Sequence, residues 1–257
     1  MNNQYNQPAF IEQLAMHTWP AEQVQNMHHW KLRASRGITK RANSVYTTAE
    51  FPLSSDWLTE IEKFYQQQQL PTTFQISDSS PAELDQILEK AGYEKVIPCL
   101  VMSAVSEVVI PLSYEGWSRS PGDPIEVSWL PTPDEQWLQH FMYIEQFPIE
   151  RKSFYEGMFP RIQPQKGFVR LSINEQTVAI GTAVAEQGWA GFLNVAIHEN
   201  YRGRGIGYKL MHSLAEWSLQ QNALNLYLQV MADNEPALAL YHKIGFTSLY
   251  RYHYRIK

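Results

Sequence analysis

The chain has 257 residues, and its 21 lysines and arginines against 26 aspartates and glutamates leave a net charge of −5 at pH 7. This length suits two domains of about 125 residues each, and the hydrophobic fraction of 44% is ample for packed cores. The acidic balance and the lack of a long basic block argue against a nucleic-acid-binding protein.

Cysteines, histidines and apolar runs narrow the class further. The single cysteine, Cys99, excludes an internal disulfide and a thiolate metal cluster, and it is predicted to be a buried strand residue. The adjacent His28 and His29 point in different directions and have no further ligands at a suitable spacing, so no metal ion is expected. The first residues lack the features of a secretion signal, and no run approaches about 18 apolar residues. We therefore expect a cytoplasmic protein that does not bind a membrane.

In chain order, the first predicted elements are two paired strands, 30–33 and 39–45, around the Arg36–Gly37 turn. A surface hairpin is the favoured interpretation; the alternative is that Arg33, Arg41 and Asn43 face a cleft between domains and bind the acceptor. A helix is predicted over 56–69, followed by a strand near 72–77, a helix over 82–91 and a strand through 101. Another strand is predicted over 107–111, and the segment 121–124 is the predicted linker.

The most informative segment runs from Asn194 to Leu210, where a short apolar strand leads into a glycine-rich turn and then a helix. Glycines 203, 205 and 207 let several backbone N–H groups approach one another, and the helix adds the positive end of its dipole. Arg202 and Arg204 add full charges at the same point. The turn therefore predicts a phosphate site.

Spacing excludes two common phosphate sites. A P-loop and a dinucleotide-binding turn that begin at Gly203 would both require a glycine at position 208, which is Tyr208. No carboxylate follows about 20 residues later to bind a ribose hydroxyl.

The sequence after the turn predicts a further strand, helix and strand. Apolar residues alternate with polar ones over 224–230, as in a strand with one buried face. Asn234 is a suitable N-cap for a helix whose apolar face includes Tyr241, and Gly245 is a suitable residue to end that helix. An aromatic strand through 246–254 completes the order.

The spacing Arg202-x-x-Gly205-x-Gly207, with the elements that follow it, resembles the acetyl-CoA pyrophosphate loop of the GNAT superfamily of N-acetyltransferases. The resemblance covers roughly residues 125 to 257. It implies acetyl-CoA as cosubstrate, with a pantetheine arm along a splayed strand. The residues that it implies for cofactor binding are Val195, Ala196, Ile197, Arg202, Gly203, Arg204, Gly205, Ile206, Gly207 and Asn234.

The resemblance also implies that Tyr241 is the general acid that protonates the departing CoA thiolate. A phenol of reference pKa near 10 can donate to a thiolate whose thiol lies near 8.5. A core aromatic on an apolar helical face is the alternative. The predicted strand 189–197 has no carboxylate to act as a base. Five glutamates in this half of the chain are interpreted as surface charges, and the base is left unassigned: Glu145, Glu150, Glu156, Glu186 and Glu199.

The first half of the chain is similar to a degenerate copy of the second. Residues 72–102 align with 226–256 as strand, helix, glycine-aromatic pair and strand. Leu88 stands where the second half has Tyr241, and the roughly 20 residues before the first copy's strand contain no glycine. We therefore predict an α/β (α+β) protein of two GNAT-like domains, each a mixed, mostly antiparallel sheet flanked by helices: a degenerate domain over 1–122 and a catalytic domain over 123–257.

The predicted function is acetyl transfer from acetyl-CoA to a primary amine of a small molecule or peptide. The acceptor is expected to bind around 147–155, and the protein is expected to be a monomer or homodimer. The alternative is a non-catalytic module that senses CoA or acyl-CoA, which would keep the loop 202–207 but would not need Tyr241.

Overall fold

A computed structural model describes residues 8–48, 50–119 and 122–257, and they form two compact units. The first unit comprises Met1–Val101 and Leu249–Lys257, and the second comprises Met102–Ser248. These bounds differ from the expected domains 1–122 and 123–257. The division into two related domains, the first degenerate, stays a prediction.

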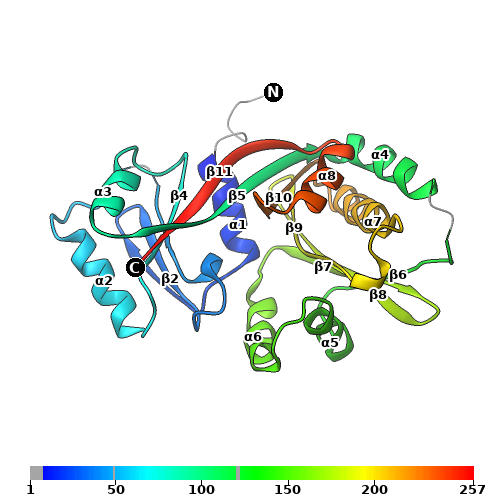
Figure 1. Ribbon diagram of the computed structural model, residues 1–257, viewed down its shortest axis with the longest axis horizontal. Helices are drawn as coiled ribbons and strands as arrows, with labels where there is room; N and C mark the ends of the chain where they lie inside the picture. The colour runs from blue at the N-terminus through cyan, green and yellow to red at the C-terminus, as the bar shows by residue number, and fades with distance from the viewer. Residues whose placement is uncertain (1–7, 49, 120–121) are drawn as a thin grey trace. The chain divides into compact units, whose positions relative to one another are not determined.

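The first unit has a mixed sheet with strand order β1-β2-β3-β4-β11 (Figure 1). β3 and β4 are parallel, and the other neighbours are antiparallel. The C-terminal strand β11 therefore pairs with a strand from the first half of the chain. Its elements are α1 (Pro8–Thr18), β1 (Gln23–Met27), β2 (Trp30–Ala34), η2 (Lys40–Ala42), β3 (Val45–Tyr46), α2 (Trp57–Gln67), β4 (Thr73–Ser77), α3 (Leu84–Lys90), most of β5 (Glu94–Val105) and most of β11 (Thr247–Ile256).

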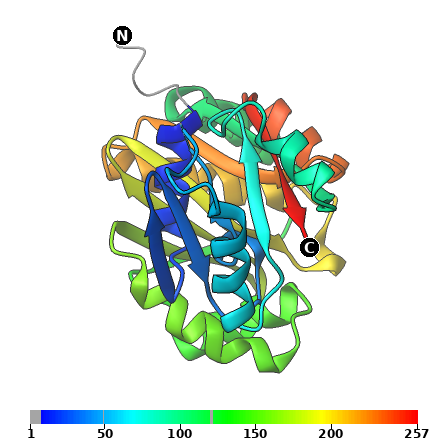
Figure 2. The same ribbon diagram turned by 90° about the vertical axis from the view of Figure 1, so that its left-hand side faces the viewer.

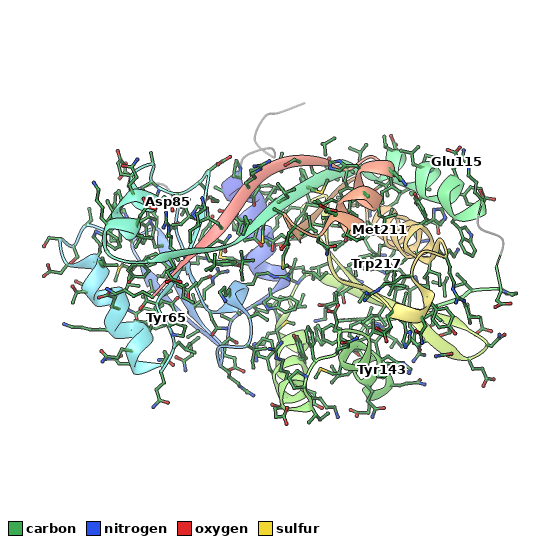
Figure 3. All side chains as sticks on the ribbon, viewed as in Figure 1. Tyr65, Asp85, Glu115, Tyr143, Met211 and Trp217 are labelled. Carbon is green, nitrogen blue, oxygen red and sulfur yellow. The ribbon has the colours of Figure 1, made fainter. Side chains whose placement is uncertain are left out.

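The core of the first unit lies between this sheet and helices α2 and α3. Figure 2 faces this unit and shows α2 in front of its strands. Strand residues such as Trp30 and Phe74 pack there against Tyr65 of α2 and Leu88 of α3. Tyr65 is labelled in Figure 3. Alternate strand residues thus supply one apolar face, which explains why the sheet forms.

The second unit has the strand order β10-β9-β8-β7-β6, in which only β9 and β10 run parallel. In Figure 1, α4 and α7 lie on one side of these strands and α5 and α6 on the other. The mixed, mostly antiparallel sheet flanked by helices was predicted and is confirmed. The elements are α4 (Ser106–Ser118), β6 (Glu126–Leu130), α5 (Glu135–Ile144), η3 (Ile149–Arg151), α6 (Lys152–Arg161), β7 (Gln165–Ile173), β8 (Gln176–Glu186), β9 (Trp189–Ile197), η4 (Glu199–Tyr201), α7 (Ile206–Gln220), β10 (Asn225–Met231) and α8 (Glu235–Lys243).

Two predicted strands were wrong. Residues 107–111 lie in helix α4, whose buried positions Ser106, Val109 and Ser113 follow a helical spacing. A short apolar run does not by itself distinguish a strand from a buried helix. Here the segment is helical because α4 packs against α7, where Gly116 leaves room for the ring of Tyr208. Residues 40–42 form a 3₁₀ turn, so only 45–46 pair with β2.

Other predicted elements are present. Helix 56–69 corresponds to α2, and Cys99 is a buried residue of β5. Of the predicted linker, Pro121 lies outside the described residues, and 122–124 belong to no helix or strand. Within the described ranges, none of the helices is long and apolar enough to cross a membrane.

The two segments that the repeat hypothesis aligned end their helices in the same way. Gly92 and Gly245 both have positive φ, 85° and 94°. The N–H of the aromatic residue after each glycine donates to a carbonyl five residues back, Tyr93 to Leu88 and Phe246 to Tyr241, at 2.9 Å in both cases. These are the hydrogen bonds of a Schellman motif. The local repeat of strand, helix, glycine-aromatic pair and strand is therefore present.

Candidate functional site

The predicted phosphate turn is an open backbone loop that leads into α7. Gly203 and Gly205 have φ of 74° and 77°, which a side chain would strain, and Gly205 is the N-cap of the helix. Among the described residues, the backbone N–H groups of Gly203, Gly205, Ile206 and Gly207 make no hydrogen bond to the protein, and residues 202–203 form a turn. Successive free N–H groups at a helix N-terminus form a site for an anion.

Two arginines and a lysine lie within or just after this loop in the sequence. Arg202 donates from Nε to the carbonyl of Ile197 at 3.1 Å, which ties the loop to the end of β9. The guanidinium of Arg204 lies 5.2 Å from the centre of the Tyr201 ring. Lys209, in the first turn of α7, lies over the ring of Trp117. The loop therefore combines oriented dipoles with positive charges.

β9 and β10 are paired only over the first part of β9. The parallel register runs from Trp189 with Asn225 to Phe192 with Leu228, and β9 continues without this partner to Ile197. The expected splay is thus where the resemblance implied it. The half-buried residues Val195, Ala196 and Ile197 lie in the part of β9 beyond this pairing.

The end of β9, the start of α7 and helix α8 meet at Gly207. A Cβ atom on Gly207 would lie 2.9 Å from Leu240 Cδ2 and 3.3 Å from Ile197 Cδ1. Leu240 precedes Tyr241 on α8, so the structure brings the predicted loop, strand and helix together. Ile206 is buried beneath the loop.

Tyr241 is 7% exposed, and its ring centre lies 5.9 Å from that of Phe246. Burial raises the pKa of its phenol to about 12. The hydroxyl makes no hydrogen bond to any described residue. Tyr241 is therefore protonated at neutral pH and has a free donor.

Asn234 caps α8, because its Oδ1 accepts a hydrogen bond from the N–H of Ala237 at 3.3 Å. The predicted capping role is confirmed. A role of the same residue in cofactor binding stays a prediction.

Sequence reasoning missed His198, which connects the loop to helix α5. Its Nδ1 accepts from the N–H of Asn200 at 3.2 Å, which starts the η4 turn before the phosphate loop. Because Nδ1 is an acceptor, Nε2 carries the proton of the neutral ring, and Nε2 lies 3.3 Å from the hydroxyl of Tyr143. A polar residue directly before a 3₁₀ turn was the available signal.

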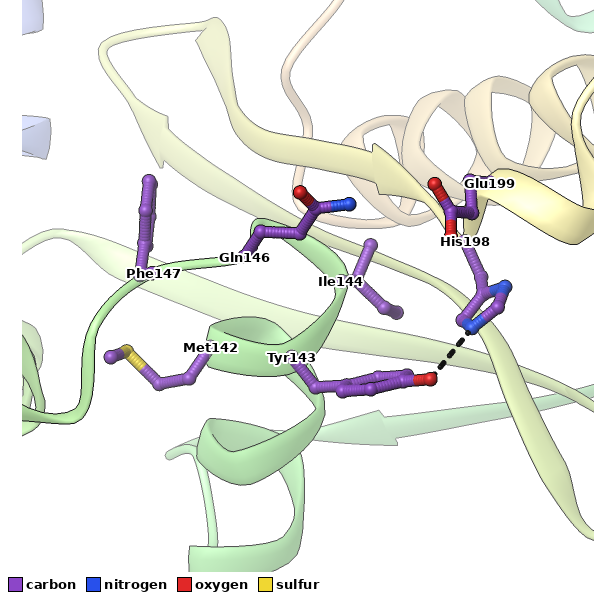
Figure 4. A pocket seen from close by; sticks show the side chains of 7 residues that line it. All are labelled: Met142, Tyr143, Ile144, Gln146, Phe147, His198 and Glu199. Carbon is purple, nitrogen blue, oxygen red and sulfur yellow. Dashed lines mark hydrogen bonds between the residues drawn. The ribbon is translucent and has the colours of Figure 1, made fainter.

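A pocket of about 430 Å³ opens beside this pair (Figure 4). Tyr143 and His198 point toward one another in the figure. Phe147, where the expected acceptor segment begins, also lines the pocket. The remaining lining residues are Met142, Ile144, Gln146 and Glu199.

The alternative interpretation of segment 30–45, in which its polar residues bind the acceptor, does not hold for Arg33 and Asn43. Arg33 and Asn43 do not face a binding cleft, because they are only 5% and 6% exposed. Arg33 donates to Gln75 and to Ser44, and Asn43 is bonded to backbone groups of its own turn. Both side chains use their hydrogen-bonding groups to hold the fold. The guanidinium of Arg41 lies over a tryptophan ring at 4.6 Å.

No described carboxylate is placed clearly as a base. Glu186 pairs with Trp189 at the start of β9, the end opposite to the phosphate loop. Glu156 lies 3.5 Å from the ammonium of Lys152. Glu199 is exposed. Within the described ranges, histidine, cysteine, aspartate and glutamate form no group of three or more that could bind a metal ion.

Comparisons with known proteins bear on this arrangement. The family model described as "Probable histone acetyltransferase Rv0428c C-terminal" matches residues 9–255. The "Uncharacterized N-acetyltransferase YobR" of Bacillus subtilis is 38% identical over 247 residues, which cover 96% of this chain and 97% of that protein.

Two solved structures share the fold. The "GCN5-related N-acetyltransferase from Kribbella flavida" has a TM-score of 0.68 at 13% identity and covers 96% of this chain and 93% of its own. The "Tandem GNAT protein from the clavulanic acid biosynthesis pathway (without AcCoA)" has a TM-score of 0.61 at 12% identity, with 78% of this chain and 68% of that chain covered.

Proposed function

This chain belongs to the GNAT superfamily of N-acetyltransferases, in the family described as "Probable histone acetyltransferase Rv0428c C-terminal", and we propose on that premise that it transfers acetyl from acetyl-CoA to a primary amine. The acceptor is a small molecule or a peptide. The observation that carries the proposal is the set of free backbone N–H groups of Gly203, Gly205, Ile206 and Gly207 at the start of α7.

These N–H groups fit the pyrophosphate of CoA. A pyrophosphate offers several anionic oxygens, and each can accept from backbone N–H groups that converge at a helix N-terminus. Arg202 and Arg204 add charge-assisted contacts. Side chains at Gly203 and Gly205 would strain the left-handed backbone that opens the loop.

We propose that the pantetheine arm binds along β9. Its amides pair with strand-like backbone, and β9 offers backbone groups beyond Phe192, where the pairing with β10 ends. Val195 and Ile197 are the residues that we propose for these hydrogen bonds. Asn234 is a further proposed contact of the cofactor.

In the proposed reaction, the amine nitrogen attacks the carbonyl carbon of the thioester. The carbon–sulfur bond breaks, the nitrogen loses one proton and the CoA sulfur gains one, so protons and charge balance. A phenol with a pKa of about 12 stays protonated until the thiolate forms. Tyr241 then stabilises the leaving sulfur by a hydrogen bond and proton donation.

The acceptor must arrive as a neutral amine. No carboxylate lies on β9 or β10, whose residues are 189–197 and 225–231. We propose that the ammonium loses its proton to water, so the rate rises with pH toward the pKa of the free amine. A profile with an additional step near pH 4 to 5, typical of a carboxylate base, would contradict this path.

The Tyr241→Phe variant tests the proposal. Release of free CoA thiol from acetyl-CoA is measured with a panel of amines, and CoA affinity is measured by calorimetry. We expect kcat to fall by about 10- to 1,000-fold, with CoA affinity within about twofold. Tyr65→Phe, a buried tyrosine of α2, is the matched control and should retain kcat.

Three results separate the alternatives. Normal turnover by Tyr241→Phe removes the tyrosine from the mechanism. Tight CoA binding by the wild-type protein with no thiol release from any amine supports the non-catalytic sensor. Absence of CoA binding contradicts both functions.

A further inference from the structure

β9 contains an irregularity at Asn194 that the proposed function does not use. Its pairing with β8 advances by one residue between Leu193 opposite Thr182 and Ala196 opposite Ile180. β9 therefore has one extra residue, a β-bulge. Asn194 has φ of 51°, a left-handed conformation that asparagine tolerates better than most residues.

The bulge aims the Asn194 side chain. Its Nδ2 donates to Thr182 Oγ1 at 3.2 Å, and Thr182 is fully buried. This hydrogen bond fixes the amide plane. Within the described part of the chain, Oδ1 of Asn194 makes no hydrogen bond, and the residue is only half-buried. The side chain thus presents a free acceptor oxygen held in a defined direction.

The residues of β8 next to Asn194 show on which face of the sheet its side chain lies. Gly181 faces α7, because a Cβ there would lie 3.3 Å from Leu210 and from Leu214. Successive strand residues point to opposite faces, so Thr182 and the amide of Asn194 lie on the face covered by α5 and α6. The acceptor segment around 147–155 joins these same two helices.

Asn194 also has a defined position along β9. The pairing with β10 ends at Phe192, two residues before Asn194, and the segment proposed for pantetheine begins at Val195. Asn194 therefore lies at the thioester end of that segment.

We infer that Asn194 binds the acceptor amine, an inference that rests on the proposed function. Oδ1 accepts one N–H of the amine and so turns the nitrogen lone pair toward the thioester carbon. That N–H remains in the amide product, while the other proton leaves, so Asn194 exchanges no proton. The site therefore suits primary amines, which carry both hydrogens in the neutral form.

The decisive variant is Asn194→Gly. Glycine keeps the left-handed backbone of the bulge and removes only the amide. We expect KM for the amine to rise and kcat/KM to fall by about 10- to 100-fold, the range for losing one hydrogen bond to a polar or charged partner, with CoA affinity within about twofold. Asn174→Gly, an exposed left-handed asparagine outside the site with φ of 49°, is the matched control.

Two further variants separate orientation from folding. Thr182→Val removes the hydroxyl that holds the amide, and kcat/KM for the amine should fall by about three- to tenfold. Asn194→Asp keeps the acceptor oxygen, so it should retain KM for the amine and add a step to the pH profile at acidic pH, where the new carboxyl titrates.

The outcomes are distinguishable from failure of the proposed function. If the wild-type protein acetylates amines and Asn194→Gly retains kcat/KM, Asn194 does not bind the acceptor. An equal loss in Asn174→Gly would show a general effect of the substitution and also overturn the inference. If the wild-type protein neither binds CoA nor releases thiol, the proposed function fails instead.

Discussion

Replacing Asp85 with asparagine tests what holds the C-terminal strand in the first unit. Asp85 lies on α3 and is labelled in Figure 3. Its Oδ1 accepts from Arg255 Nε at 2.7 Å and lies 2.8 Å from His253 Nε2. Arg255 and His253 belong to β11, and the side chain of Arg255 is only 6% exposed. We call these three residues the Asp85 clamp.

The magnitude follows from the pKa of Asp85. The hydrogen bond from Arg255 lowers this pKa from 3.8 to about 2. The folded pKa lies below the unfolded one, so the stabilisation is complete above about pH 4 and is lost as the pH falls toward 2. A difference of this size corresponds to about 2 kcal/mol at pH 7 and about half of that at pH 3.

Asp85→Asn keeps the shape of the side chain and removes its charge. We expect the free energy of unfolding to fall by about 2 to 3 kcal/mol at pH 7, because Arg255 then has only Glu89, at 3.3 Å, as a carboxylate partner. Urea titrations at pH 7 and pH 3, followed by tryptophan fluorescence, measure the difference. Glu89→Gln is the control, because Glu89 is 68% exposed and its pair should contribute less than about 1 kcal/mol.

Two results would refute the reasoning about the Asp85 clamp. One is an Asp85→Asn protein as stable as the wild type at pH 7. The other is a difference that stays the same at pH 3, because the charge of Asp85 is then not its source.

Three other predictions concern separate parts of the chain. Gly203→Ala and Gly188→Ala each place a Cβ in open space at a positive φ, 74° and 79°, so each should cost about 1 kcal/mol of stability. Only Gly203→Ala should weaken CoA binding in calorimetry. Equal CoA affinities of the two variants would contradict the phosphate site. Burial raises the pKa of Glu12 from 4.5 to about 7, so its charged form destabilises the fold at high pH. Glu12→Gln should therefore be more stable than the wild type by about 3 kcal/mol at pH 9 and by less than about 1 kcal/mol at pH 5. Equal shifts of the urea midpoint at both pH values would exclude this cause. His198→Ala removes the cap of η4 and should raise KM for acetyl-CoA by about three- to tenfold. Asparagine can also cap a helix, so His198→Asn should recover most of the affinity. Identical KM values for the two variants would contradict a role of the cap.

The prediction of the second half succeeded where the signal was local. The helix α8 was predicted from its N-cap Asn234, its apolar face and its terminal Gly245, and all three features are present. The glycine-rich turn before α7 was predicted because its geometry depends on glycines within a few residues of one another, and its binding of phosphate stays a prediction. The hydrogen-bonding needs of a helix end are met by its immediate neighbours in sequence.

The wrong predictions concern residues whose structure depends on contacts with residues far away in the sequence. The run 107–111 is helical because α4 packs on α7, about 100 residues later, with Gly116 against Tyr208. Arg33 was a candidate for acceptor binding, but Ser44 and Gln75 enclose it. An arginine's burial cannot be read from its neighbours in sequence, because it depends on strands that pair across the sheet.

The sequence alone therefore determined the fold class, the superfamily and the glycine-rich turn before α7, since these follow from local spacing and backbone conformation. Only the tertiary structure decided that Tyr241 is buried with a free hydroxyl, that His198 links the loop to α5, and that β9 bulges at Asn194. Those properties arise from pairing register and packing between elements far apart in the chain, which no short stretch of residues encodes.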